Sequence, residues 1–267
     1  MNNTVSLLDL TGKTAIITGG AAGIGFGISL RLAEAGANVV IANRTKDAGE
    51  RAAEEIVKKG FKAMAIETDV SVEESVKHMV DETIKTFKSI DILVNNAGIY
   101  PSIPLEEMSL QDFEKVINTN LIGVFLCTKY VSGEMIKQGN GGRIINITSI
   151  DALHPSSIGL AHYDASKHGV WGFTKNIALE LAPHKIWVNA IAPGGILTPG
   201  VKKLQEAMPI APNADMEKVM DSFLAKIPMR RFGDADEIGK VALFLASDMS
   251  SYMTGSQIVV DGGTLLA

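Results

Sequence analysis

The sequence predicts an α/β fold in which helices cover both faces of a doubly wound, parallel sheet of seven strands. Three observations predict it: short apolar runs alternate with helical patterns along the chain, the runs show no polar alternation, and a glycine-rich turn joins the first run to the first helix. Apolar runs of this kind are typical of strands buried on both faces of a parallel sheet. With 267 residues, 46% of them hydrophobic, residues 1–267 are expected to form one domain with a substantial core.

The seven predicted strands are short apolar runs at residues 13–17, 38–42, 62–67, 91–94, 142–147, 186–191 and 257–260. The helical patterns between them cover residues 26–35, 46–59 and 72–87, two segments within 109–138, and a segment from Tyr163 to about Ala182. Strands that are joined by helical crossovers lie parallel, so their carboxyl ends meet at one edge of the sheet. Ligands of doubly wound sheets bind at that edge.

The turn after the first predicted strand is suited to a phosphate group. It reads Thr18-Gly19-Gly20-Ala21-Ala22-Gly23-Ile24-Gly25 and leads into a helical pattern. Its glycines allow a tight turn and a close approach to an anion, which the N–H groups and dipole of a helix N-terminus favour. The spacing alone arises readily by chance in a chain with 26 glycines, but its place between a buried strand and a helix predicts a dinucleotide site.

Tyr163 is a candidate general acid and base. Lys167 follows it by four residues in a helical pattern, and residues four apart share one helix face, about 6 Å apart along the axis. A cation about 4 Å from a phenol, at an effective dielectric constant near 20, contributes roughly 4 kcal/mol and lowers the phenol pKa by about three units. The alternative is a core tyrosine beside a solvated lysine. Ser149, at the end of a predicted strand, favours the catalytic interpretation.

Composition and charge argue against several classes of protein. A net charge of −5 argues against nucleic-acid binding, which requires a basic surface. The single cysteine, Cys127, cannot form an intrachain disulfide, as is typical of a reducing cytosol. No run of about eighteen apolar residues predicts a membrane span, the first ten residues lack a secretory pattern, and the histidines lack metal-ligand spacing. We therefore expect a cytoplasmic protein without a metal site and without a membrane or nucleic-acid partner.

A series of motifs over about residues 10–263 follows the order of a known family. The motifs are Thr18-Gly19-x-x-x-Gly23-x-Gly25, Asp69-Val70, Asn95-Asn96-Ala97-Gly98, Asn120, Ser149, Tyr163-x-x-x-Lys167, Pro193-Gly194 and Asp261-Gly262-Gly263. In these motifs the chain resembles a classical short-chain dehydrogenase/reductase. The resemblance implies a Rossmann-type fold and a nicotinamide-dependent oxidoreductase that interconverts a ketone and a secondary alcohol. The chain departs from the common motif in the segment Ile147-Thr148-Ser149-Ile150-Asp151, which lacks the usual paired serines.

The same resemblance implies a role for each catalytic residue. Tyr163 would exchange a proton with the substrate oxygen, and Ser149 would donate a hydrogen bond to that oxygen. Lys167 would lower the phenol pKa and bind ribose hydroxyls. Asn120 would hold a water molecule that joins Lys167 to solvent, with Asn118 as the competing candidate.

The resemblance also implies which residues bind the cofactor. The resemblance assigns the adenine amino group to Asp69, the adenosine ribose to the turn after the fourth strand, and the carboxamide to the segment after Pro193-Gly194. Two assignments have structural alternatives: Asp69 as a helix N-cap, for which Ser71 is better suited, and the asparagines as turn residues. The implied cofactor residues are Thr18, Gly19, Gly23, Ile24, Gly25, Asn43, Arg44, Asp69, Val70, Asn95, Ala97, Gly98, Tyr163, Lys167, Pro193, Gly194, Ile196 and Thr198.

The end of the second predicted strand favours NADP(H) over NAD(H). An NAD site usually has a carboxylate there, which binds the ribose hydroxyls and repels a 2′-phosphate. This chain has the neutral Asn43 followed by Arg44, whose guanidinium can bind a phosphate and stack on adenine. The alternative is an NAD enzyme in which Arg44 is a solvated loop residue.

The substrate and the assembly are less well specified by the sequence. Residues 194–228 predict an apolar, methionine-rich lid, which suits a ketone or alcohol with a sizeable hydrophobic part. Packing of the lid within the domain or against a subunit is the alternative.

We expect the homotetramer common in the family, with a dimer as the alternative, because segment 121–127 is apolar almost all round. A nicotinamide-binding regulator without catalysis is the less favoured function, because Ser149, Tyr163 and Lys167 are all present.

Overall fold

Seven parallel strands form the main sheet of the structure, a computed structural model that describes residues 4–198 and 224–267. Their spatial order is β3-β2-β1-β4-β5-β6-β9, so the winding reverses between β1 and β4, as in a Rossmann-type sheet. The strands are β1 (Thr14–Thr18), β2 (Asn38–Asn43), β3 (Ala63–Glu67), β4 (Ile92–Asn95), β5 (Gly142–Ile147), β6 (Ile186–Pro193) and β9 (Gln257–Val260). The predicted seven-stranded parallel sheet is confirmed.

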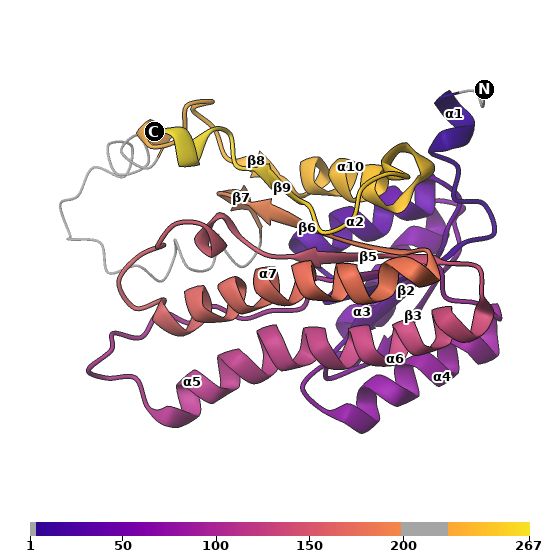
Figure 1. Cartoon of the computed structure of the whole chain (residues 1–267), viewed down its shortest axis with the longest axis horizontal. Helices are drawn as coiled ribbons and strands as arrows, with labels where there is room; N and C mark the ends of the chain where they lie inside the picture. The colour runs from indigo at the N-terminus through magenta and orange to yellow at the C-terminus, as the bar shows by residue number, and fades with distance from the viewer. Residues whose placement is uncertain (1–3, 199–223) are drawn as a thin grey trace.

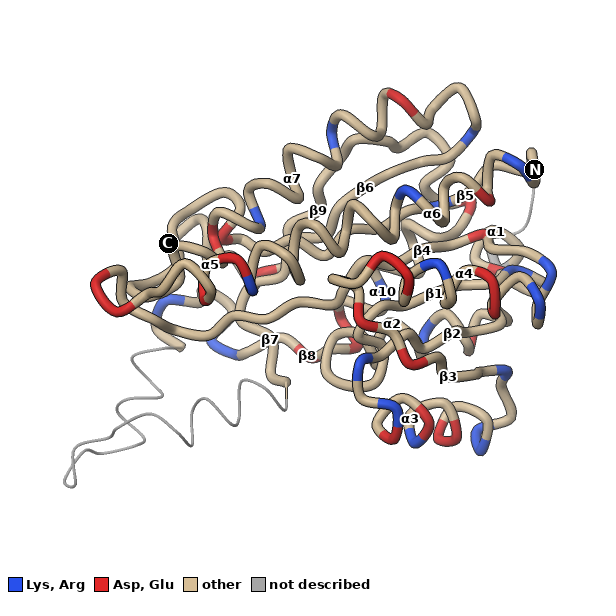
Figure 2. Tube along the Cα trace, turned by 90° about the horizontal axis from the view of Figure 1, so that it is seen from below, with Lys and Arg blue, Asp and Glu red and all other residues tan. Residues whose placement is uncertain are grey.

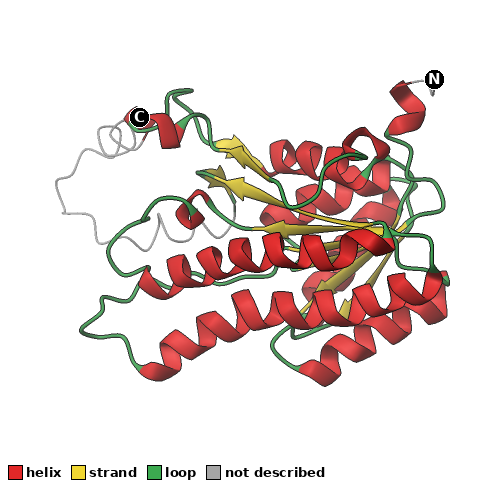
Figure 3. Cartoon of the chain, in the orientation of Figure 1, coloured by secondary structure: helices red, strands yellow, loops and turns green. Residues whose placement is uncertain are grey.

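Helices cover both faces of this sheet, as Figure 1 and Figure 3 show. One face is covered by α2 (Gly23–Glu34), α3 (Lys46–Lys58) and α10 (Ala235–Ala246). The other is covered by α4 (Glu73–Phe87), α6 (Gly123–Gln138) and α7 (Ala161–Leu181), with α5 (Leu110–Ile117) beside α7. Shorter elements are α1 (Thr4–Leu7), a small sheet of β7 (Ile196–Leu197) and β8 (Gly233–Asp234), and single turns at η2 (Ile150–Ala152), η3 (Ala182–His184), η4 (Asp248–Ser250) and η5 (Thr264–Leu266).

Successive residues of the central strands face opposite cores. Ile17 and Ile41 belong to the core under α2, α3 and α10, whereas Ile16 and Val40 belong to the core under α4, α6 and α7. All four side chains are fully buried. Each such side chain contributes about 1.5–3 kcal/mol when it leaves water. Burial on both faces explains why these strands appear in the sequence as continuous apolar runs.

The segment predicted as two helices within 109–138 contains an unexpected π-helical turn. Between α5 and α6, residues Asn118–Ile122 form η1, a turn whose hydrogen bonds span five residues. This wider turn belongs to a continuous helical path from α5 to α6, in which Asn120 is buried. Turns of this kind are frequent at functional sites, and they leave no periodic signal in a sequence.

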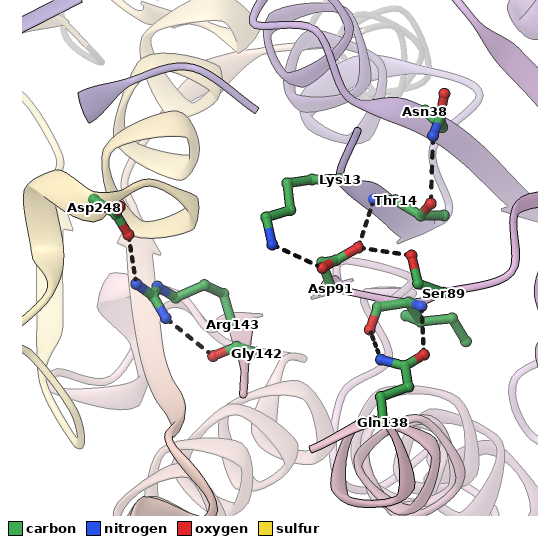
Figure 4. A network of polar contacts seen from close by, with 10 residues as sticks. Lys13, Thr14, Asn38, Ser89, Asp91, Gln138, Gly142, Arg143 and Asp248 are labelled. Carbon is green, nitrogen blue, oxygen red and sulfur yellow. Dashed lines mark hydrogen bonds and ion pairs between the residues drawn. The ribbon is translucent and has the colours of Figure 1, made fainter. Parts of the chain in front are cut away.

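Polar residues at the amino ends of the strands bind one another (Figure 4). Asp91, just before β4, accepts a hydrogen bond of 3.0 Å from the backbone N–H of Thr14 and pairs with Lys13 Nζ at 3.0 Å. Beside it, the Gln138 amide exchanges two hydrogen bonds of 2.9 Å with the backbone of Ile90. These contacts pair the polar groups at the amino edge of the sheet with one another. The carboxyl edge carries the glycine-rich turn and the predicted catalytic residues.

Candidate active site

A cavity of about 460 Å³ lies at the carboxyl ends of β1, β4, β5 and β6. Segments far apart in the sequence meet there, as the positions of the strand ends predicted. The cavity is lined by Gly19, Ala22, Gly23, Ile24, Gly25, Asn96, Ala97, Gly98, Tyr100, Ile147, Thr148, Ser149, Asp151, Leu160, Tyr163, Lys167, Pro193, Gly194, Gly195, Ile196 and Thr198. The predicted site residues that do not line it are Thr18, Asn43, Arg44, Asp69, Val70, Asn95 and Asn120.

The glycine-rich turn forms a cradle that side chains would fill. Gly19 and Gly23 have positive φ angles of 62° and 52°, which favour glycine. A Cβ atom on Gly25 would lie 2.2 Å from the carbonyl oxygen of Gly19, so no side chain fits there. The residue that precedes α2, Ala22, provides no side-chain cap for the first N–H groups of the helix. These free donors and the open backbone fit the pyrophosphate of a dinucleotide.

Thr18 and Asn96 hold this cradle against the turn after β4. Thr18 Oγ1 accepts hydrogen bonds from the backbone N–H groups of Asn96 (3.0 Å) and Ala97 (3.1 Å). The Asn96 side chain donates back to the carbonyl oxygens of Thr18 (2.9 Å) and Gly19 (3.2 Å). Thr18 is therefore a support for the turn, with its side chain buried beneath it.

The side chain of Asn95 faces the core and not the cavity, and the assignment of Asn95 to the ribose stays a prediction. This side chain is buried, and its amide donates to Thr128 Oγ1 (3.1 Å) and to Asn146 Oδ1 (2.8 Å) under α6. Asn96, for which the sequence predicts only a turn role, lines the cavity, and its side chain binds the glycine cradle. The reason is the alternation of a strand, because Asn95 is the last residue of β4 and its side chain points to the core below the sheet.

Tyr163 and Lys167 lie one turn apart on α7, and both line the cavity. The Lys167 ammonium lies 5.6 Å from the centre of the Tyr163 ring and donates a hydrogen bond of 2.8 Å to the carbonyl oxygen of Ile147, the last residue of β5. Tyr100 packs edge-on against the Tyr163 ring, with the ring centres 5.9 Å apart. The phenol ring thus lies between Lys167 on its own helix and Tyr100 in the segment after β4.

The pKa of Tyr163 changes in the direction opposite to the one predicted. Burial raises the pKa of the phenol above its ordinary value, a hydrogen bond with Ser149 opposes this effect, and the carboxylates of Asp151 and Asp164 add to it. Burial also lowers the pKa of Lys167 to about 8. The spacing of the two residues accounts for the attraction of a cation but not for the loss of water around both groups, and burial is the larger effect here. In the protein without cofactor, Tyr163 is therefore a neutral phenol.

Ser149 shares its hydroxyl with the carboxylate of Asp151, for which the sequence predicts no role. Ser149 Oγ donates a hydrogen bond of 2.9 Å to Asp151 Oδ2 and accepts one of 3.2 Å from the backbone N–H of Asp151. Asp151 belongs to the single turn η2 and also lines the cavity. Burial raises its pKa, and the nearby charge of Asp164 adds to this. The departure from the paired-serine motif was the only sequence signal for it.

Asn120 lies behind the cavity and supports its floor. Its side chain donates to Ser166 Oγ (3.1 Å) and to the carbonyl oxygen of Ile99 (2.9 Å), and it accepts from the backbone N–H of Ile99 (2.8 Å). The rival Asn118 is exposed to solvent. The structure thus distinguishes the two candidates by burial, and the proposed water link through Asn120 stays a prediction.

The segment after β6 forms the far wall of the cavity. Pro193, Gly194, Ile196 and Thr198 all line it. A Cβ atom on Gly194 would lie 2.7 Å from Asp261 Cα, so the close approach of this segment to the C-terminal turn requires glycine. Part of the predicted lid, residues 199–223, lies outside the described residues.

The predicted adenine-side residues lie outside the cavity. Asp69 Oδ1 accepts hydrogen bonds from the backbone N–H (2.9 Å) and hydroxyl (2.6 Å) of Ser71, which lower the pKa of Asp69 together with the charge of Arg44. Neither Asp69 nor Ser71 is an N-cap, because α4 begins after Val72. Val70 is buried against Gly123, so only its backbone can face a ligand.

His162 and Cys127 lie in the interior of the protein and do not line the cavity. His162 is fully buried and accepts a hydrogen bond from the backbone N–H of Tyr163, and Cys127 is buried in the core. Within residues 4–198 and 224–267, no three His, Cys, Asp or Glu side chains are grouped to hold a metal ion. Across the same residues, no helix combines the length and the hydropathy that a membrane crossing requires.

Known proteins match this chain over nearly its whole length. A family model described as enoyl-(acyl carrier protein) reductase matches residues 19–264. A 3-oxoacyl-(acyl-carrier-protein) reductase of Staphylococcus epidermidis is 42% identical over 252 residues, 94% of this chain and 98% of the relative. A short-chain type dehydrogenase/reductase from Mycobacterium marinum superposes with a TM-score of 0.91 at 39% identity, over 99% of this chain and 100% of its own.

Two further solved structures hold different cofactors. A 7α-hydroxysteroid dehydrogenase with NADH and 7-oxo glycochenodeoxycholic acid has a TM-score of 0.89 at 36% identity, covering 98% of each chain. A gluconate 5-dehydrogenase from Burkholderia cenocepacia with NADP and tartrate has a TM-score of 0.89 at 32% identity, covering 99% of this chain and 100% of its own. The chain belongs to the classical short-chain dehydrogenase/reductase family, and it is an NAD(P)-dependent oxidoreductase of CH–OH and C=O groups.

Proposed function

We propose that this enzyme uses NADP(H) to interconvert a ketone and a secondary alcohol whose remaining part is sizeable and hydrophobic. The observation that carries the proposal is the meeting of Ser149, Tyr163 and Lys167 in one cavity with the glycine cradle. When bound, the nicotinamide supplies or accepts a hydride. Tyr163 is placed to exchange the proton of the substrate oxygen, Lys167 to attract the cofactor, and Ser149 to bind the same oxygen.

The preference for NADP(H) is supported by the end of β2. Asn43 is neutral, and its amide donates a hydrogen bond of 2.9 Å to the carbonyl oxygen of Thr45, so no carboxylate there repels a 2′-phosphate. Arg44 is exposed, makes no salt bridge among the described residues, and acts electrostatically on Asp69. The relative with bound NADP agrees with this choice, whereas the relative with NADH keeps NAD(H) as the alternative.

Replacing Arg44 with alanine should weaken NADP(H) binding by more than about tenfold and leave NAD(H) binding nearly unchanged, because only NADP(H) has a phosphate for the guanidinium. Titration of cofactor fluorescence measures both dissociation constants. Lys46→Ala, which removes a nearby exposed cation, is the matched control and should change neither. Equal weakening of both cofactors would assign Arg44 to adenine stacking, and no change would make it a bystander.

The hydrophobic part of the substrate is supported by the described wall of the cavity. Tyr100, Leu160 and Ile196 contribute apolar surface beside Tyr163. Two relatives, a 3-oxoacyl-(acyl-carrier-protein) reductase and a 7α-hydroxysteroid dehydrogenase, are named for compounds with large apolar parts. The methionines of the predicted lid lie outside the described residues. A panel of ethyl acetoacetate, acetophenone, cyclohexanone and acetoacetyl-coenzyme A, with the matching alcohols, tests the proposal through nicotinamide absorbance. No turnover of any pair would contradict it.

We also propose a homotetramer in the cytoplasm. On α6 and α7, which run side by side through a contact of Phe125 with Phe173, apolar side chains reach solvent, including Leu179 at 75% exposure. Figure 2 shows few charged residues along α7 and a dense mixture of both signs on α3. Val259 and Leu266 at the C-terminal end are exposed as well. Apolar surface of this extent favours contact with other copies of the chain.

Light scattering at micromolar concentration should give about four times the chain mass of 28.4 kDa. Leu179→Glu should reduce that mass, because a carboxylate would be buried in the interface. Val57→Glu on α3, which is also exposed, should leave it unchanged. A stable mass near that of one chain for the wild type would refute the assembly.

A further inference from the structure

A carboxylate lies inside the cavity beside the proposed catalytic serine. Asp151 is the middle residue of η2, and its Oδ2 accepts the hydroxyl hydrogen of Ser149 over 2.9 Å. Its backbone N–H donates to the same Ser149 oxygen over 3.2 Å. Among the described residues, Asp151 forms no salt bridge that would occupy the carboxylate. Asp151 is therefore bonded to the group that is expected to bind the substrate oxygen.

The hydrogen bonds of Ser149 determine what it can offer a substrate. A hydroxyl has one hydrogen to donate and two lone pairs that accept. The hydrogen of Ser149 goes to Asp151, since an ionised carboxylate can only accept, and one lone pair is used by the Asp151 N–H. The remaining lone pair can only accept a hydrogen bond. Tyr163, a neutral phenol that is itself hydrogen-bonded to Ser149, is the donor toward that lone pair until a substrate oxygen takes its place.

This pair of groups matches an alcohol better than a ketone. A substrate hydroxyl can accept from Tyr163 and donate to Ser149, so both contacts are satisfied. A ketone oxygen can accept from Tyr163, but it has no hydrogen for Ser149 and faces a lone pair there. A ketone binds equally well only if Ser149 first gives up its bond to Asp151.

We propose that Asp151 is a positioning residue that fixes the direction of the Ser149 hydrogen bond, so that the site binds a secondary alcohol in preference to the corresponding ketone. The inference rests on the proposed function and adds which form of the substrate is held more tightly. The surroundings of Asp151 make the effect depend on pH. Asp164 on α7 opposes its ionisation, whereas Lys167 on α7 and His154 after η2 favour it, and β6 presents no titratable side chain. Below the pKa of Asp151, which burial raises, its carboxyl hydrogen can go to Ser149 and release the serine hydrogen for a ketone.

Binding without turnover tests this inference, because the equilibrium constant of the reaction fixes the ratio of the two kcat/KM values and a variant cannot change that ratio. The dissociation constant of the alcohol is measured with NADPH and that of the ketone with NADP⁺, by calorimetry or cofactor fluorescence. The probes are 1-phenylethanol with acetophenone, or ethyl 3-hydroxybutanoate with ethyl acetoacetate, whichever pair the wild type converts.

In Asp151→Ala, the ketone should bind about tenfold more tightly, because Ser149 is free to donate. The alcohol should bind about tenfold more weakly, because the carboxylate no longer holds the Ser149 lone pair toward it or strengthens that oxygen as an acceptor. Asp151→Asn should shift both constants in the same directions by less, since an amide accepts more weakly than a carboxylate. The improvement of ketone binding by the wild type toward acid pH should be lost in both variants. Inhibition of ketone reduction by the alcohol product should weaken in parallel.

Asp164→Asn is the matched control, because it removes one nearby negative charge and leaves the bond between Ser149 and Asp151 in place. Asp164 binds Ser156 and acts on the site only through its charge. If Asp164→Asn weakened alcohol binding and strengthened ketone binding as much as Asp151→Ala does, the effect would be one of charge alone. That result would overturn the inference. Unchanged constants in both Asp151 variants, or a change of both constants in one direction, would overturn it as well. Failure of the wild type to convert any probe would instead refute the proposed function, and the inference with it.

Discussion

Replacing Tyr163 with phenylalanine should reduce kcat at least about 100-fold, because a general acid or base in the right position contributes 10²–10⁴. The substitution removes one oxygen atom and keeps the ring that packs against Tyr100. The cradle of Gly19, Gly23 and Gly25 is untouched, so the dissociation constant of the cofactor should stay nearly the same. Steady-state rates by nicotinamide absorbance and a fluorescence titration with the cofactor measure the two quantities.

Tyr100→Phe is the control for this experiment. It removes a second phenol whose ring centre lies 5.9 Å from that of Tyr163, and it should cost far less activity. Retention of more than about a hundredth of the wild-type kcat in Tyr163→Phe would show that another group transfers the proton. Because its raised pKa keeps Tyr163 neutral, the phenol acts first as a hydrogen-bond donor to the substrate oxygen.

The fold could be predicted because its signal is local. Strands buried on both faces are rich in Val, Ile and Ala, so their positions follow from apolar runs alone. The contact of α2 with α10 has no such signal. A Cβ atom on Gly239 would lie 2.6 Å from the carbonyl oxygen of Gly27, so these glycines allow two helices to approach closely. Within the sequence, both look like weak points of a helix.

The site could be predicted at the level of its segments and not of each side chain. Ser149, Tyr163 and Lys167 follow strand ends or share a helix face, so they meet in the cavity as the spacing indicated. Asn95 and Asn96 are adjacent, and only the end of β4 decides which side chain faces the cavity. The bond between Ser149 and Asp151 depends on a single turn, η2, for which the sequence has no period.

Electrostatic properties were the hardest to predict, because they depend on burial. The spacing of Tyr163 and Lys167 predicted a lowered phenol pKa, yet the loss of hydration raises it. The Lys167 ammonium forms its hydrogen bond with the backbone of Ile147 and not with the phenol. A helix pattern gives the distance between two side chains, but it does not give the water that each one loses.

Replacing Lys167 with methionine should weaken cofactor binding by about tenfold or more and reduce kcat at least about 100-fold. Methionine keeps much of the volume, so the loss reports the charge and its hydrogen bonds. Among the described residues that line the cavity, Lys167 is the only basic one, so it is the side chain that attracts an anionic cofactor there. Lys175→Met, an exposed position on the same helix, is the control and should bind the cofactor normally.

The pH dependence distinguishes a charge effect of Lys167 from a change of shape. Burial lowers its pKa to about 8, so the ammonium is present below that pH and is lost as the pH rises through it. Cofactor affinity should therefore fall above about pH 8 in the wild type and show no such fall in Lys167→Met. Because the anionic cofactor favours the charged form, binding near pH 8 should take up a proton, which calorimetry in two buffers of different ionisation enthalpy detects. Binding that stays constant from pH 7 to 9 in the wild type would show that the Lys167 charge does not hold the cofactor.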